Sequence, residues 1–155
     1  MQNGRREDFW QRYGDVAVRV GANLQPGQTL RVVAGVDHVP LARAVMDAAW
    51  RAGAGNVEVY YYDDYERYLL ARHGADDMLD RTGAAARGVL QASLDSKGAS
   101  INIVGDAAPP FFDDADPDRL ARTQAKESRE LSMRLMNEKL DAWCVIAYPD
   151  TTWAE

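Results

Sequence analysis

The chain has 155 residues, of which 46% are hydrophobic and 27% are charged, a composition typical of one soluble domain with a substantial core. The 18 Lys and Arg residues against 24 Asp and Glu give a net charge of −6, which argues against binding to the phosphate backbone of nucleic acid. No apolar run approaches the ~18 residues of a membrane span, and the amino terminus lacks the apolar segment of a signal peptide. We therefore expect a cytoplasmic protein with no membrane partner, and the single Cys144 fits a reducing compartment.

Helix-type and strand-type patterns alternate along the chain. Strands are short apolar runs rich in β-branched residues, and helices repeat apolar residues every three or four positions. On these criteria we predict strands at residues 30–34, 57–62, 100–104 and 142–148, and helices at 4–24, 40–52, 65–72, 75–96 and 117–140. The alternation predicts an α/β fold over residues 1–155: a single domain with an open, mostly parallel four-stranded sheet, flanking helices and a flavodoxin-like or Rossmann-like order.

Proline, glycine and aspartate mark where these elements begin and end. Pro26 and Gly27 predict a type II turn before the first strand, and Pro40 is suited to the first turn of the next helix. Asp116 is predicted to cap the last helix with its carboxylate. Residues 107–115 include two consecutive prolines and are predicted to lack regular structure.

Asp37 and His38 are the best-placed polar pair, because they follow the first strand, where open α/β sheets bind ligands near the switch point. One interpretation is a ligand contact or an acid–base pair. The other, which we favour, is a turn residue followed by a histidine at the helix entrance, since no nucleophile or second carboxylate can be tied to the pair. Neither a P-loop nor a GxGxxG pattern follows the first two strands, so a nucleotide cofactor is not expected.

The remaining histidine and the cysteine show no spacing typical of a metal site. His73 is interpreted as a residue of a helix carboxyl terminus, where a cation suits the helix dipole. Cys144 lies among apolar neighbours and is interpreted as a core residue. No catalytic, cofactor-binding or metal-binding residue is therefore assigned to this chain.

Two clusters of like residues have both a structural and a functional interpretation. The aromatic cluster consists of Tyr60, Tyr61, Tyr62, Tyr65 and Tyr68. We favour core packing for it over a protein interface or a ligand site. The acidic cluster consists of Asp113, Asp114, Asp116 and Asp118. We favour a solvated loop with a helix cap over a cation site, because the spacing is not that of an EF-hand.

Several phrases occur together in one order: VRVGANLQPGQTLRVVAG, VPLARAVMDAAWRAGAGNVEVYYYD, DPDRLARTQ and WCVIAYPDTTWAE. The most specific parts are NLQPGQ, PLARAV with the following AGA and VEV, and AYP with TWA. In this order they resemble the N-terminal domain of the thermophilic metalloaminopeptidases of the aminopeptidase T and aminopeptidase S type. The resemblance covers most of residues 13–155.

This resemblance implies a parent protein two to three times as long, whose C-terminal catalytic domain binds two divalent metal ions of the zinc or cobalt type and hydrolyses peptides. It also implies a homodimer in the parent. None of the family's metal ligands maps onto residues 1–155, so we expect an N-terminal, non-catalytic domain whose partner is its own C-terminal domain. Only residues 150–155 follow the last predicted strand, which is therefore either an edge strand or the start of a connection to more chain. The alternatives are a stand-alone flavodoxin-like module that binds a small ligand near Asp37 and His38, or a protein-interaction domain that uses the tyrosines.

Overall fold

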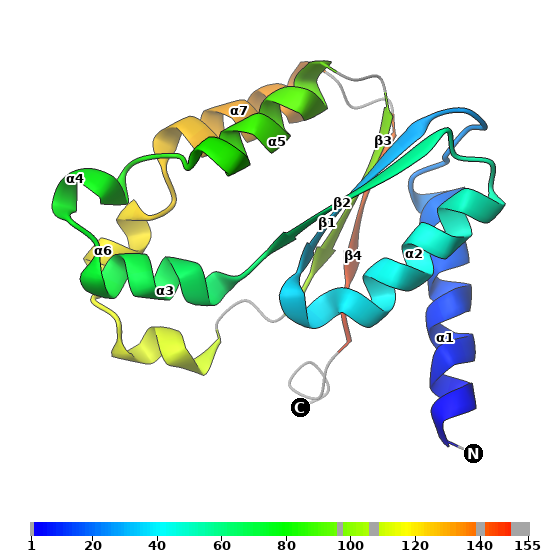
Figure 1. Cartoon of the computed structure of the whole chain (residues 1–155), viewed down its shortest axis with the longest axis horizontal. Helices are drawn as coiled ribbons and strands as arrows, with labels where there is room; N and C mark the ends of the chain where they lie inside the picture. Colours follow the sequence, from blue (N-terminus) through cyan, green and yellow to red (C-terminus); the bar gives the residue numbers. More distant parts are fainter. Residues whose placement is uncertain (1, 96–97, 106–108, 139–141, 150–155) are drawn as a thin grey trace. The chain divides into compact units, whose positions relative to one another are not determined.

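The chain folds into two compact units (Figure 1). The computed structural model describes residues 2–95, 98–105, 109–138 and 142–149. Unit 1 consists of Met1–Tyr62, Lys97–Ala107 and Asp141–Glu155, and unit 2 consists of Asp63–Ser96 and Ala108–Leu140. The chain thus leaves unit 1 twice, after the second and after the third strand, to build unit 2.

Unit 1 holds the sheet. Its elements are α1 (Gln2–Val16), a π-helical turn η1 (Ala17–Gly21), β1 (Thr29–Gly35), a 3-10 turn η2 (Val36–His38), α2 (Val39–Arg51), β2 (Asn56–Tyr62), β3 (Gly98–Val104) and β4 (Trp143–Ala147). All four strands are parallel and lie in the order β2-β1-β3-β4. These are the first four positions of the flavodoxin-like order 2-1-3-4-5, so the predicted fold class is confirmed. The last strand is one of the two edges.

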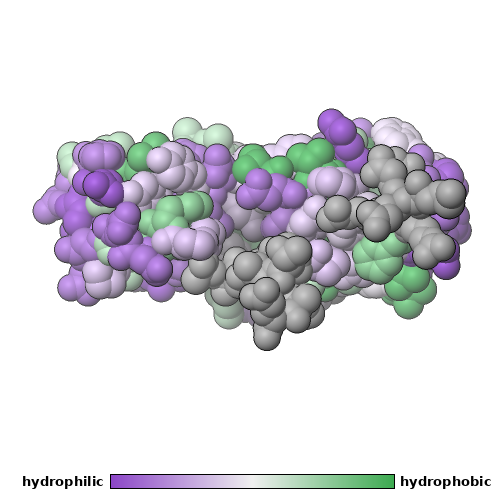
Figure 2. Space-filling view, turned by 90° about the horizontal axis from the view of Figure 1, so that it is seen from below, coloured by the Kyte–Doolittle hydropathy of each residue, from purple (hydrophilic) through white to green (hydrophobic). Residues whose placement is uncertain are grey.

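The surface mixes polar and apolar residues. On the face that Figure 2 shows, hydrophobic residues lie in small groups among hydrophilic ones. In the part of the chain that the structure describes, no helix is both long and apolar enough to cross a membrane.

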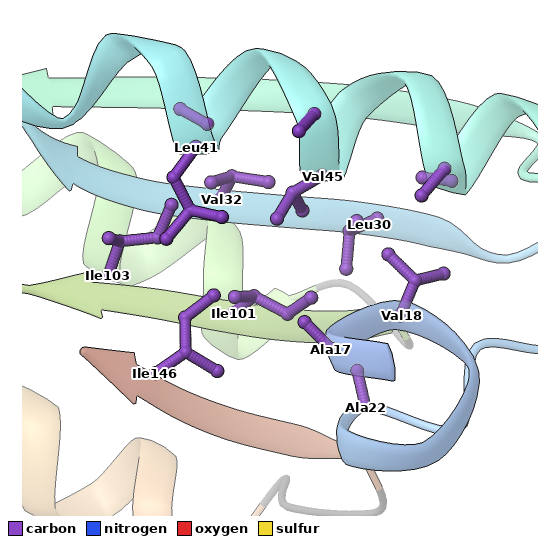
Figure 3. Packing of buried hydrophobic residues seen from close by; sticks show 14 of the residues in the cluster. Ala17, Val18, Ala22, Leu30, Val32, Leu41, Val45, Ile101, Ile103 and Ile146 are labelled. Atoms are coloured by element: carbon purple, nitrogen blue, oxygen red, sulfur yellow. The ribbon is translucent and has the colours of Figure 1, made fainter. Parts of the chain in front are cut away.

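The core of unit 1 lies between one face of the sheet and the helices α1 and α2. Leu30 and Val32 of β1 and Ile101 of β3 are fully buried under Leu41 and Val45 of α2 (Figure 3). Burying one such side chain contributes about 1.5–3 kcal/mol to the free energy of unfolding. The buried alanines of α2, Ala44 and Ala48 among them, let the helices approach closely. The register Val32↔Ile101 keeps the apolar positions of neighbouring strands on one face.

The first predicted helix, 4–24, is α-helical only to Val16 and continues as the π-helical turn η1 from Ala17 to Gly21. The N–H of Ala22 donates to the carbonyl of Ala17, five residues earlier, at 2.8 Å. Gly14 lies so close to α2 that a Cβ there would be 2.7 Å from the carbonyl oxygen of Ala44. The predicted type II turn is also present: Gly27 has φ +81°.

Unit 2 is helical. It contains α3 (Asp64–His73), α4 (Asp76–Leu79), α5 (Ala84–Asp95), a 3-10 turn η3 (Pro110–Asp114), α6 (Pro117–Arg122) and α7 (Lys126–Glu138). Here two predictions were wrong, because the continuous helices expected at 75–96 and 117–140 are each divided into two. The prediction that 107–115 lacks regular structure was wrong for the five residues of η3. The predicted end of the last helix at 139–140 and the segment 150–155 lie outside the described residues.

Contacts between distant parts of unit 2 explain the two breaks. The guanidinium of Arg122 donates to the carboxylate of Asp80 and to the carbonyl of Asp76 at 2.7 Å, so α6 holds the chain where α4 ends. The hydroxyls of Thr82 and Ser128 lie 3.0 Å apart and connect the break after α4 to α7. The breaks let α3 pair with α6 and α5 pair with α7. Tertiary contacts thus override a local pattern that favours one long helix.

Candidate functional site

The carboxyl ends of three strands bring His38, Gly105 and Tyr148 together in unit 1. His38 ends the short turn η2 that follows β1, Gly105 follows β3, and Tyr148 follows β4. The rings of His38 and Tyr148 are stacked with centroids 4.9 Å apart and planes 26° apart. A Cβ on Gly105 would overlap Nε2 of His38. This place lies at the switch point between β1 and β3, where the sequence predicted the best-placed polar pair.

His38 is buried and held by the backbone of β1. Its side chain is 8% exposed, and its Nδ1 accepts a hydrogen bond from the N–H of Gly35 at 3.2 Å. Because Nδ1 is the acceptor, the neutral ring carries its proton on Nε2. Asp37, by contrast, is exposed. The two residues of the predicted pair thus differ, since His38 is buried and Asp37 is exposed. Ligand binding by this pair stays a prediction.

Tyr148 lies between two other rings, and we call Trp10, His38 and Tyr148 the aromatic clamp. Trp10 of α1 stacks on Tyr148 with centroids 5.1 Å apart and planes 6° apart. The N–H of Tyr148 donates to the carbonyl of Val104 at 2.7 Å. Next to the clamp, the hydroxyl of Tyr13 donates to the carbonyl of Ala147 at 3.0 Å. The end of β4 is thus fixed by α1, by β3 and by the turn after β1.

Sequence reasoning missed that Tyr148 stacks on His38, and that Trp10 and Tyr13 of α1 hold the end of β4 beside it. Both Trp10 and Tyr13 fall within the helix predicted at 4–24, but no sequence pattern shows which strand end that helix approaches. Burial raises the pKa of the Tyr13 hydroxyl above its ordinary value, so this group keeps its proton and its role as donor at neutral pH.

The metal ions implied by the resemblance do not fit the side chains of this part of the chain. Among the described residues, no group of three or more His, Cys, Asp or Glu side chains is arranged to hold a metal ion. One histidine, His38, is engaged in the clamp, and the other, His73, is exposed in the last turn of α3, as predicted for it. We therefore derive no metal-dependent step from these residues.

Cys144 packs at the margin of the core, where its sulfur atom faces Gly21 of the π-helical turn. It is half-buried and packs against the buried core cluster, in line with the core interpretation. Burial raises the pKa of its thiol, which lowers the fraction of reactive thiolate at neutral pH.

The tyrosine cluster is divided between an edge strand and a helix. Tyr68 is buried in unit 2, where its ring lies 5.6 Å from that of Phe111. Tyr61 and Tyr65 are 37% and 46% exposed, so core packing was wrong for these two residues. Tyr62 of β2 is half-buried. For Tyr61 the physical reason is that β2 is an edge strand, which among the described strands pairs only with β1, whereas Tyr65 lies in α3.

The acidic cluster is a helix cap, as expected. The carboxylate of Asp116 accepts hydrogen bonds from the N–H groups of Asp118 at 2.9 Å and Arg119 at 3.2 Å, at the start of α6. Asp113 and Asp114 are exposed. This arrangement satisfies backbone donors that a helix start leaves unpaired.

Known proteins resemble the chain along nearly its whole length. The model of the family described as thermophilic metalloprotease (M29) matches residues 7–155. Aminopeptidase 2 of Geobacillus stearothermophilus is 29% identical over 154 residues, which are 97% of this chain and 37% of that protein. Aminopeptidase T of Thermus thermophilus is 26% identical over 148 residues, which are 93% of this chain and 36% of that protein.

A solved structure has the same fold. It is wild-type AmpT from Thermus thermophilus, with a TM-score of 0.82 and 22% identity, covering 97% of this chain and 38% of that one. The chain thus spans little more than a third of the length of the relatives it matches. Because the family model matches almost all of its residues, the chain belongs to the thermophilic metalloprotease (M29) family.

Proposed function

We propose that this chain is the N-terminal, non-catalytic α/β domain of a metal-dependent aminopeptidase that removes N-terminal residues from peptides. The observation that carries the proposal is the difference in length: 97% of this chain matches 37% of Aminopeptidase 2 of Geobacillus stearothermophilus. The relatives' names supply the activity, and a non-catalytic role is supported because no group of three or more His, Cys, Asp or Glu side chains among the described residues is arranged to hold a metal ion.

In this proposal the partner of the chain is its own C-terminal catalytic domain. That domain binds two divalent metal ions, of the zinc or cobalt type, and peptide substrates. The chain's role is to shape or cover the catalytic cleft, and the parent protein is a cytoplasmic homodimer. The clamp supports a scaffolding role, because Tyr148 is fixed by Trp10 and His38 close to the end of β4 and gives the chain that follows a defined starting point.

The test is an activity assay with and without a catalytic domain. The 155-residue chain is incubated with a chromogenic aminoacyl substrate and zinc or cobalt, and we expect no turnover. A chimera that joins this chain to the remaining portion of Aminopeptidase 2 is expected to hydrolyse the substrate. The matched control is that remaining portion alone. Turnover by the 155-residue chain would contradict the non-catalytic assignment, and equal activity with and without this chain would contradict a role at the cleft.

The topology also supports a second candidate, a small-ligand module with its site at the strand ends near Asp37 and His38. Its test is the Asp37→Ala variant, which changes an exposed side chain and leaves the clamp intact. If a ligand is bound there, this change weakens its binding. Unchanged binding would leave Asp37 as a turn residue.

A further inference from the structure

Strand β4 is an edge of the sheet, and half of its backbone groups face outward. Among the described strands it pairs only with β3. The N–H of Ser100 donates to the carbonyl of Ala142, and the N–H of Tyr148 donates to the carbonyl of Val104. Successive residues of a strand direct their N–H and C=O groups to opposite sides. The even-numbered residues from 142 to 148 therefore bond to β3, and the odd-numbered ones face the open edge.

The outward groups belong to Trp143, Val145 and Ala147. The carbonyl of Ala147 is already used, because it accepts the hydrogen bond from the hydroxyl of Tyr13 at 3.0 Å. The carbonyl of Val145 accepts only from the thiol of Cys144, at 3.8 Å, a weak donor that leaves the second lone pair of the oxygen for another bond. The backbone groups of Trp143 and Val145 and the N–H of Ala147 are thus available to a further strand.

The side chains of β4 that point away from the core are apolar and exposed. Ile146 is buried in the core beside Ile101, as Figure 3 shows. Because side chains alternate along a strand, Trp143 and Val145 lie on the opposite face of the sheet. They are 44% and 49% exposed. The sequence of β4, WCVIA, contains no charged residue and no proline, so it lacks features that commonly keep an edge strand unpaired.

The topology of the sheet places the next strand at this edge. The described strands, in the order β2-β1-β3-β4, are the first four of the flavodoxin-like order 2-1-3-4-5, in which the fifth strand lies beside the fourth. Crossovers between parallel strands are right-handed. The step outward from β4 runs opposite to the step from β1 to β2, which α2 makes on the core face. A helix leading to a fifth strand would therefore lie on the other face, where Trp143 and Val145 are exposed.

We propose that a fifth strand, from the portion of the parent protein that follows this chain, pairs parallel with β4, and that the helix leading to it covers Trp143 and Val145. The relatives have length for such a segment, since this chain matches 37% of Aminopeptidase 2 and 36% of Aminopeptidase T of Thermus thermophilus. A parallel crossover needs only about a dozen residues or more. The inference rests on the proposed function, in which this chain is the N-terminal part of a longer protein, and it names the surface that receives the following part.

Residue-resolved hydrogen exchange tests the pairing. It is measured on the 155-residue chain and on the chimera that joins this chain to the remaining portion of Aminopeptidase 2. The amides of Cys144 and Ile146 bond to β3 and are expected to be protected in both proteins. The amides of Val145 and Ala147 face the open edge, and we expect their exchange to slow at least about tenfold in the chimera. Equal exchange of these two amides in both proteins, or full protection of them in the 155-residue chain alone, would overturn the proposal.

Two exposed tryptophans provide a matched test of the covering helix. Trp143 of β4 is 44% exposed, and Trp50 of α2 is 52% exposed. Trp143→Lys is expected to lower the urea midpoint of the chimera and to leave that of the 155-residue chain nearly unchanged, because the lysine is covered only in the chimera. Trp50→Lys is expected to have the same effect on both proteins. A Trp143→Lys change that shifts both midpoints equally would contradict the covering helix.

The activity of the chimera reports separately on the proposed function. An active chimera without added protection at Val145 and Ala147 would overturn this attachment and leave the aminopeptidase assignment standing. Protection of these amides in an inactive chimera would support the attachment and count against that assignment. If the chimera does not fold, exchange is compared between whole Aminopeptidase 2 and the part of it that matches this chain. There the strand that matches β4 is expected to gain protection in the whole protein, and equal exchange would overturn the proposal.

Discussion

Replacing His38 with alanine tests whether the aromatic clamp stabilises unit 1. The change removes the acceptor of the Gly35 N–H, and an unpaired buried donor costs about 1–3 kcal/mol. It also removes one of the two rings that stack on Tyr148, worth about 0.5–1.5 kcal/mol. We therefore expect the free energy of unfolding of unit 1 to fall by about 1.5–4.5 kcal/mol.

Asparagine at the same position separates the two contributions. Its amide oxygen can take the place of Nδ1 and keep the bond from Gly35, while the ring is lost. For His38→Asn we expect only the loss of the ring contact, about 0.5–1.5 kcal/mol. The difference between the two variants then reports on the hydrogen bond alone.

Tryptophan fluorescence is the suitable probe for urea unfolding of these variants. All four tryptophans belong to unit 1, so emission excited selectively in tryptophan follows this unit and not unit 2. Equal losses for alanine and asparagine would show that the bond to Gly35 contributes nothing. A loss below about 0.5 kcal/mol for alanine would refute the clamp as a stabilising contact.

Two further predictions concern single contacts in each unit. Gly105→Ala is expected to destabilise unit 1 by about 1–3 kcal/mol, because the added Cβ would overlap the ring of His38. Gly88→Ala is expected to stabilise unit 2 by about 0.5–1 kcal/mol, because Gly88 lies in the interior of α5 and an added Cβ would have no heavy atom within 4 Å. Urea midpoints measure both, and a neutral Gly105→Ala would contradict the close approach. The hydrogen bond from Arg87, at 2.7 Å, lowers the pKa of Glu127 in the folded protein. This ion pair therefore stabilises the fold fully at a pH above the ordinary pKa of a glutamate carboxyl, and the stabilisation is lost as the pH falls through the lowered pKa of Glu127. Unfolding of Arg87→Gln followed by circular dichroism is expected to show a deficit at neutral pH that disappears in acid, and a deficit independent of pH would contradict this linkage.

The sheet could be predicted from sequence because its signals are local. Short β-branched runs bounded by Gly and Pro gave all four strands, and the helix between the first two begins with Pro40 at its second position. Asp116 predicted the start of α6, because its carboxylate caps backbone N–H groups only two and three residues further along the chain. Where one residue type and its neighbours decide the conformation, the sequence is sufficient.

The features that were missed depend on residues far apart in the chain. The division between α4 and α5 is fixed by contacts from Arg122 and Ser128, which lie about forty residues further along the chain. The exposure of Tyr61 depends on β2 being an edge strand, and an apolar run looks the same at an edge and in the middle of a parallel sheet. The stacking of Trp10 on Tyr148 likewise joins the two ends of the sequence.

The switch point itself gives a physical reason to prefer a scaffold over a small-ligand module. In flavodoxin-like sheets a ligand occupies the space beyond the ends of the strands that flank the reversal of order. In this chain the ring of His38 lies there. It accepts a hydrogen bond from the N–H of Gly35, stacks on Tyr148 and lies so close to Gly105 that a Cβ on Gly105 would overlap it. A ligand taking the place of this ring would have to displace it and leave the Gly35 N–H unpaired, at a cost of about 1–3 kcal/mol before any new contact forms. A sheet that fills its usual ligand position with its own side chain is suited to holding a shape, which is what the proposed non-catalytic domain requires.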